Sequence, residues 1–280
     1  MDLSYQNQIN VLKNKYNLSI QNYEFATIIL KTIGFYRLSG YGLEFLKENS
    51  NNEYINGTNI QTLYNLYCFD SKLRNILMHI LEILEIQLKE QISNFIATKY
   101  GIYGYLEKNN FSDNKNSNNT FIYDIVMQKL NKEIERNSKL KRKKLYAWEA
   151  IDLFTFGSLS NLYTILKNDD KKHIASLYNT TPKYLKNWIL VLVELRNICA
   201  HHVMIYNNHL KQTPYLYKEN MKYRKNFNTL FPVLLIIKRM LNSNKTWDRF
   251  RIDLYNTIEE YTIYEYLKNI GFPSGWNEIL

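Results

Sequence analysis

A helical spacing of apolar residues runs without a break from Ile60 to about Tyr100, and it limits the folds open to this chain. Leucine, isoleucine and phenylalanine recur three or four residues apart, at positions 66, 69, 73, 76, 77, 80, 84 and 88. That period places them on one face of an α-helix. Glu85 and Lys89 add a favourable charge pair one turn apart. We therefore predict one long helix over these residues.

The rest of the sequence also favours helices. Its 280 residues include only 9 glycines and 4 prolines, fewer than a chain of many short strands and tight turns requires. Residues 17–19 are expected to cap the second helix, and Pro232 to mark the start of a later helix or a kink in it. Helical patterns are predicted near residues 4–16, 20–33, 120–137, 182–205 and 226–242, with a helical pair over 145–168 interrupted at 156–158.

No segment has the alternating pattern of a strand, so the predicted fold class is all-α. Residues 1–58 are expected to form an N-terminal helical region that packs on a helical domain of residues 59–280. The N-terminus, MDLSYQNQINVLKNKY, lacks the apolar core of a signal peptide. Cys68 and Cys199 lie inside apolar helical patterns, which suits free thiols in a reducing compartment. We therefore expect a cytoplasmic protein.

The net charge of the chain suits an anionic partner. Lysine and arginine number 36 against 26 acidic residues, a formal charge of +10. Such an excess favours nucleic acid first and a membrane surface second. The composition of an AT-rich genome, which enriches lysine and asparagine, explains the same charge without any partner. No apolar run reaches the roughly 18 residues that would span a membrane, so no membrane partner is expected.

Residues 195–202, LRNICAHH, carry the clearest chemical signal. On a helical wheel of about 100° per residue, His202 falls on the apolar face that Leu195 and Cys199 share. Asn197 and His201 lie together on the opposite face. We therefore interpret His202 first as a buried structural histidine and only second as catalytic support, and His201 as an exposed, reactive one.

Three of these side chains suit cleavage of RNA without a metal ion. His201 can act as general base or acid near neutral pH, and Asn197, one turn earlier, can orient its ring. Arg196, on the flank of the helix, can stabilise the negative charge of a pentavalent phosphorane. RNA supplies its own nucleophile in the 2′-hydroxyl. No cofactor is expected, and no cysteine pair or His-Glu helix motif indicates a metal site.

Residues 73–79, LRNILMH, repeat part of this motif within the long helix. Arg74 again falls on the flank, and His79 lies opposite the apolar stripe. One interpretation is that a single chain supplies both halves of a composite site. The other, which we prefer, is that Arg74 makes a structural ion pair and His79 is an ordinary exposed residue.

Two basic segments are candidates for contact with RNA. The run KLKRKK at 139–144 can bind a phosphate backbone, or it can be a solvated helix end. The segment MKYRKNF at 221–227 interleaves cations with aromatic rings, which suits unpaired bases, although tyrosine is abundant throughout the chain. The candidate residues are Lys139, Lys141, Arg142, Lys143, Lys144, Lys222, Arg224 and Lys225.

Several ordered motifs resemble a known family. RNICAH fits the R-N-x-x-x-H pattern of HEPN-domain ribonucleases, and the chain resembles the Abi-like abortive infection proteins of bacteria (AbiD/AbiF type). The motifs that carry the resemblance are FYRLSGY at 35–41, YCFDSKLRNIL at 67–77, WEAIDLFTFGSLSNLY at 148–163, LRNICAHHVMIYNN at 195–208 and IGFPSGW at 270–276.

The resemblance implies an all-α HEPN fold and a metal-independent endoribonuclease that acts as a phage-defence toxin. It further implies a small structured RNA as antitoxin, and a composite site that two Arg–His motifs often form across a homodimer. By position, Arg196, Asn197 and His201 would be the functional residues. The chain departs from the family pattern at Met204 and Asn208, where basic residues are expected.

Two other functions remain open from the sequence. A non-catalytic RNA-binding module, acting as a sensor or scaffold, would fit the basic charge and the missing cations after the histidines. A helical protein-interaction domain would fit if the charge were incidental.

Overall fold

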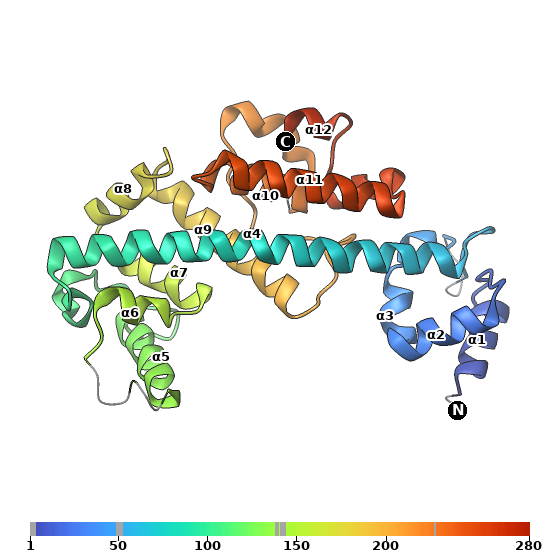
Figure 1. Ribbon diagram of the computed structural model, residues 1–280, viewed down its shortest axis with the longest axis horizontal. Coiled ribbons are helices and arrows are strands. Elements are labelled where there is room, and N and C mark those ends of the chain that lie inside the picture. The colour runs from blue at the N-terminus through green and yellow to red at the C-terminus, as the bar shows by residue number, and fades with distance from the viewer. Residues whose placement is uncertain (1–3, 49–52, 138–139, 141–143, 227) are drawn as a thin grey trace. The chain divides into compact units, whose positions relative to one another are not determined.

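The computed structural model describes residues 4–48, 53–137, 140, 144–226 and 228–280. Every regular element that these residues form is a helix (Figure 1), and their only β-type pairs are isolated bridges between single residues. The predicted all-α class is therefore confirmed. Within the same ranges, no helix combines the length and the apolar character needed to cross a membrane.

The long helix α4 spans Ile60–Tyr100, as the apolar spacing predicts. The side chain of Asn59 begins it by accepting a hydrogen bond from the backbone N–H of Thr62 at 2.8 Å. Gly101, whose φ of 88° suits glycine, ends it. Its buried apolar side chains, which hold the helix in place through packing, are Ile60, Leu63, Leu66, Phe69, Leu73, Leu77, Ile80, Leu81, Leu84, Leu88, Ile92 and Ile96.

The chain divides into two compact units. The first comprises Met1–Asn75 and Ile252–Leu267, and the second comprises Ile76–Arg251 and Lys268–Leu280. The division therefore falls inside α4 and inside α11 (Asn244–Tyr261), whereas the boundary expected from the sequence lies at residue 58.

The first unit is built on three short helices, α1 (Tyr5–Asn14), α2 (Tyr23–Thr32) and α3 (Phe35–Gly40). Its core gathers buried aliphatic side chains from these helices and from the start of α4. The expected cap of α2 at residues 17–19 is wrong. The side chain of Asn22 accepts from the backbone N–H of Phe25 at 2.9 Å, so the helix begins later.

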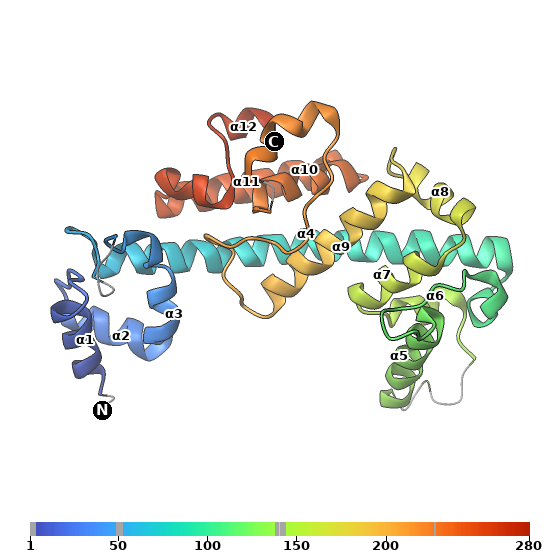
Figure 2. The same ribbon diagram turned by 180° about the vertical axis from the view of Figure 1, so that it is seen from behind.

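The second unit contains the later part of α4, the start of α11 and, among the residues that the structure describes, seven further α-helices. Two of these helices, α7 and α8, pack against α9, and α5 packs against α7. In Figure 2, α9 crosses in front of α4. The helices are α5 (Ile122–Arg136), α6 (Ala147–Asp152), α7 (Phe156–Ile165), α8 (Asn168–Ser176), α9 (Pro182–Ala200), α10 (Leu230–Met240) and α12 (Trp276–Ile279).

The break between α6 and α7 lies earlier than the sequence suggests. We expected it at residues 156–158, but Phe156 already belongs to α7. The hydroxyl of Thr155 accepts from the backbone N–H of Ser158 at 3.2 Å and so caps α7 at its start. Pro232 lies in the first turn of α10, where its missing N–H costs no helical hydrogen bond.

Candidate active site at the end of α9

The buried face of α9 is the one that the helical wheel predicts up to Cys199. Pro182 occupies the first turn, and the buried side chains are Leu185, Trp188, Ile189, Val191, Leu192, Leu195 and Cys199. This packing fixes the helix in the second unit and decides which residues near its end face outward.

The helix ends at Ala200, five residues before the predicted end. The backbone N–H of Val203 donates to the carbonyl of Ile198 at 3.0 Å, and that of His202 donates to Cys199 at 3.2 Å. These two bonds, with a φ of 55° at His202, form the Schellman motif that terminates helices. A histidine is unusual in this left-handed position, which explains why the sequence did not reveal that α9 ends here.

The early end of the helix changes the position of His202. The helical wheel placed His202 on the buried face, and this prediction is wrong, because the side chain is exposed. His201, the capping residue of α9, is also exposed. Its imidazole makes no hydrogen bond with any residue in the described part of the chain. Both histidines therefore reach solvent, and the ring of His201 is available to a ligand.

Asn197 lies one turn before His201, and Arg196 directly precedes Asn197. The Nη1 of Arg196 donates to Oδ1 of Asn197 at 3.4 Å, and the backbone carbonyl of Asn197 accepts from the N–H of His201 at 3.0 Å. Asn197 is exposed and Arg196 is about one-third exposed. The amide of Asn197 thus contacts the arginine, and Asn197 lies about 40° around the helix from His201.

Glu85 of α4 is a partner of Arg196 that sequence reasoning missed. The Nε of Arg196 lies 3.9 Å from Oε2 of Glu85, while the Nζ of Lys89 lies 3.3 Å from its Oε1. Lys89 also donates to the carbonyl of Asp152 in α6 at 3.0 Å. The pair of Glu85 and Lys89 was predicted, but the approach of Arg196 depends on the packing of α9 beside α4, which no local pattern encodes.

Another part of the polar face of α9 is covered by the segment of residues 211–215. Glu194 accepts from the backbone N–H groups of Lys211 at 2.7 Å and Gln212 at 2.9 Å. Asn187 donates to the carbonyl of Thr213 and accepts from the N–H of Tyr215. Glu194, which the wheel places beside Asn197 and His201, therefore holds a loop, and the open part of the face lies at the C-terminal end.

The residues after the two histidines form a hydrogen-bonded turn. The side-chain amide of Asn208 donates to the carbonyl of Met204 at 2.8 Å. Tyr206 is buried, and its hydroxyl accepts from Asn269 at 2.8 Å. The two positions that depart from the family pattern thus stabilise the loop, and neither supplies a cation near His201.

The second Arg–His motif lies on α4, where its arginine is buried and its histidine is exposed. Arg74 is 4% exposed and forms an ion pair with the buried Asp70, which also accepts from the hydroxyl of Tyr41 at 2.8 Å. Burial and the Asp70 carboxylate raise the pKa of Tyr41, so its hydroxyl stays protonated and donates. His79 is exposed. By helix geometry it lies about 120° around α4 from Glu85, the residue that Arg196 faces.

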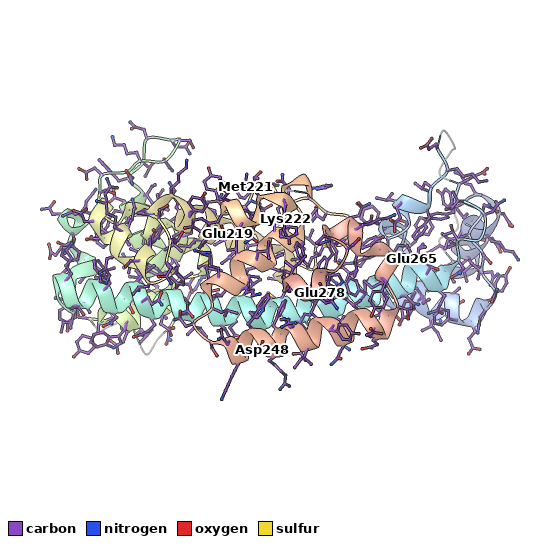
Figure 3. The ribbon with its side chains drawn as sticks, turned by 90° about the horizontal axis from the view of Figure 1, so that it is seen from above. Glu219, Met221, Lys222, Asp248, Glu265 and Glu278 are labelled. Atoms are coloured by element: carbon purple, nitrogen blue, oxygen red, sulfur yellow. The ribbon has the colours of Figure 1, made fainter. Side chains whose placement is uncertain are left out.

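The candidate RNA-contacting lysines and arginines are described only in part. Lys144 is exposed, and so is Lys222, which comes from the 3-10 helix η4 (Lys218–Asn226) together with Glu219 and Met221 (Figure 3). Lys139, Lys141, Arg142 and Lys143 lie outside the described residues, as do the side chains of Arg224 and Lys225.

Comparison with known proteins gives one match. A family model described as Abi-like protein matches residues 28–207, more than half of the chain, and this range contains α9 and both histidines. No curated protein and no solved structure matches the chain significantly. Among the described residues, no group of three histidine, cysteine, aspartate or glutamate side chains is placed to hold a metal ion.

Proposed function

The chain belongs to the Abi-like protein family, which supports a role in abortive infection, and we propose that it acts there as an RNA-cleaving toxin. The proposed activity is that of a metal-independent HEPN-type endoribonuclease that uses the 2′-hydroxyl of RNA as nucleophile. The observation that carries the proposal is the exposed, unbonded imidazole of His201 one turn after the exposed Asn197, whose side chain contacts the partly exposed Arg196.

The proposed reaction needs these side chains, the RNA and one further proton donor. His201 takes the proton of the 2′-hydroxyl, whose oxygen attacks the adjacent phosphorus. Arg196 donates hydrogen bonds to the phosphorane as its negative charge increases. The 5′-oxygen leaves with a proton that a second proton-transfer group donates, which yields a 2′,3′-cyclic phosphate and a 5′-hydroxyl. Asn197, through its contact with Arg196, positions the guanidinium.

The ion pair with Glu85 sets the resting position of Arg196 without locking it there. A pair at 3.9 Å whose arginine is about one-third exposed is screened by water and contributes at most about 1 kcal/mol. An RNA phosphate with bidentate geometry forms stronger, charge-assisted hydrogen bonds. Arg196 can therefore exchange the Glu85 carboxylate for a phosphate when RNA binds.

A complete site needs a second proton-transfer group, because one histidine cannot act as base and acid in the same step. A second copy of the chain would supply another His201, which is the reason to propose a homodimer. Within a single chain, His202 follows His201 in the sequence and is a weaker candidate for the same role. A small structured RNA that occupies the surface around His201 would act as the antitoxin, because it would prevent the RNA substrate from binding there.

A non-catalytic RNA-binding module is the second candidate function. The absence of basic side chains at Met204 and Asn208 and the contact between Arg196 and Glu85 favour it, since both weaken phosphate binding. Under this hypothesis the chain would retain a defined RNA intact.

Analysis of the reaction products separates the two functions. Purified protein incubated with RNA in EDTA should produce fragments that end in a 2′,3′-cyclic phosphate and a 5′-hydroxyl. Intact RNA after long incubation would support the binding module. Cleavage that disappears when EDTA is added would contradict the metal-independent mechanism.

A further inference from the structure

Three aromatic rings lie side by side on the surface of the second unit, away from any role described above. The ring centres of Tyr103 and Tyr146 are 5.5 Å apart, and those of Tyr146 and Trp148 are 5.0 Å apart, each pair tilted by 34°. Tyr146 is 36% exposed and Trp148 is 45% exposed. The rings thus form a short row that leaves the indole of Trp148 open at one end.

The backbone on both sides of this row is fixed. The N–H of Ala147 donates to the carbonyl of Ile102 at 2.8 Å, which joins the start of α6 to the chain after α4. The hydroxyl of Tyr105 donates to the carbonyl of the buried Leu145 at 2.9 Å. A ligand that stacks on the row therefore meets rings carried by a backbone that is already ordered, so less entropy is lost on binding.

A positive charge accompanies the rings. The Nζ of Lys144 lies 4.0 Å from the ring centre of Tyr103, and Lys144 is the last residue of the basic run at 139–144. The nearest acidic side chain along the chain, Glu149, accepts from the backbone N–H of Tyr146 at 2.9 Å and so caps α6. Exposed aromatic faces beside a cation complement a polyanion that carries aromatic bases.

Trp148 differs from the other tryptophans of the chain. Trp188 and Trp247 are 1% and 5% exposed, and Trp276 is half-buried. Trp148, at 45% exposed, is the most accessible of the four tryptophans, and it adjoins two further rings.

We propose that Tyr103, Tyr146 and Trp148 form a stacking platform for the unpaired bases of single-stranded RNA, with Lys144 contacting the backbone. This inference rests on the proposed RNA-directed function and gives that function a binding surface distinct from the surface around His201. Every base presents an aromatic face, so the platform accepts RNA with little sequence preference. Paired bases are already stacked within a duplex, so duplex RNA binds less tightly.

The test measures the affinity of the full-length protein for a short 2′-O-methyl oligouridine, which cannot be cleaved because it has no free 2′-hydroxyl. Loss of one base–aromatic stack predicts that Trp148→Ala weakens binding about 5- to 150-fold. Trp148→Phe, which keeps an aromatic face, should weaken it much less. An oligomer with the same backbone and no bases should bind both variants and the wild type equally.

Tryptophan fluorescence gives a second measurement on the same samples. The oligouridine should quench the emission of the wild type, and most of this quenching should be absent in Trp148→Phe, because the other tryptophans are partly or wholly buried. Melting temperatures of the variants confirm that the fold is retained.

Three results would overturn the proposal. The first is equal affinity of Trp148→Ala and wild type for the oligouridine. The second is an equal loss of affinity for the base-free oligomer. The third is a changed sedimentation coefficient of Trp148→Ala with RNA binding unaffected, which would identify the platform as a protein interface. Failure of wild-type protein to cleave natural RNA, with Trp148-dependent binding preserved, would instead contradict the ribonuclease alone.

Discussion

The guanidinium of Arg196 faces the carboxylate of Glu85, with 3.9 Å between Nε and Oε2, so the proposed catalytic arginine on α9 is oriented by an acidic residue on α4. Lys89 shares the same carboxylate from the other side. Glu85 therefore places a negative charge next to the position that an RNA phosphate would occupy, and the two compete for Arg196.

This competition predicts that Glu85→Gln tightens RNA binding. Removal of the carboxylate frees Arg196 for phosphate, and the expected gain is up to about fivefold in affinity, which corresponds to a partly exposed ion pair. The measurement is RNA binding at fixed ionic strength, since affinity depends steeply on salt. Glu82→Gln, an exposed position on the same helix, removes the same charge without touching Arg196. Equal effects of the two substitutions would show that only net charge matters.

The planar array of N–H donors in the guanidinium of Arg196 should increase the cleavage rate beyond the effect of its positive charge. Arg196→Ala is expected to slow cleavage about 10²- to 10³-fold, the usual loss when a transition-state donor is removed. Arg196→Lys keeps the charge and loses the planar array, so its rate should fall between those of wild type and alanine. Single-turnover cleavage rates check this order. A lysine variant as active as the wild type would mean that Arg196 acts only as a general positive charge.

The buried pair of Arg74 and Asp70 should be structural. Arg74→Met leaves the Asp70 carboxylate buried without its cation and is expected to cost about 3–5 kcal/mol of stability, measured by denaturant unfolding. Lys72→Met is the matched control, because Lys72 lies on the same helix and pairs with Glu260 at the surface. It should change stability little. A small effect of Arg74→Met would show that the pair is dispensable for folding.

His79 should be dispensable for cleavage. It is exposed, and it points about 120° around α4 from the Glu85 side chain that Arg196 faces. His79→Ala is therefore expected to cleave RNA at the wild-type rate. A loss as large as that of His201→Ala would restore the interpretation in which one chain supplies both halves of the site.

The sequence predicted the extent of α4, from Ile60 to about Tyr100, because its signal is local and repeated. In the structure, twelve buried apolar positions, a capping Asn59 and a terminating Gly101 all agree with this range. The short helices α3 and α8 lack such redundancy and were not predicted, because their few apolar positions become a buried face only through packing against other elements. The longer helix α11 was also not predicted, although its buried residues Trp247, Phe250, Leu254 and Ile258 recur at helical spacing.

The residues of the candidate site could be named from the sequence, but their arrangement in space could not. The spacing of Arg196, Asn197 and His201 was visible, but the position of His202 was wrong because the helical wheel assumes that α9 continues. A histidine at a φ of 55° has no sequence signature, unlike the glycine usually found there. The partner of Arg196 was hidden for another reason, since Glu85 lies more than a hundred residues earlier in the chain.

The role of His201 as the proton-transfer group is the central claim, and its most direct test is the cleavage rate of His201→Ala in EDTA. General acid–base catalysis predicts a loss of about 10²- to 10⁴-fold. His209→Ala, an exposed histidine in the same segment, is the control and should cleave at the wild-type rate. Equal cleavage by His201→Ala and wild type would contradict the account.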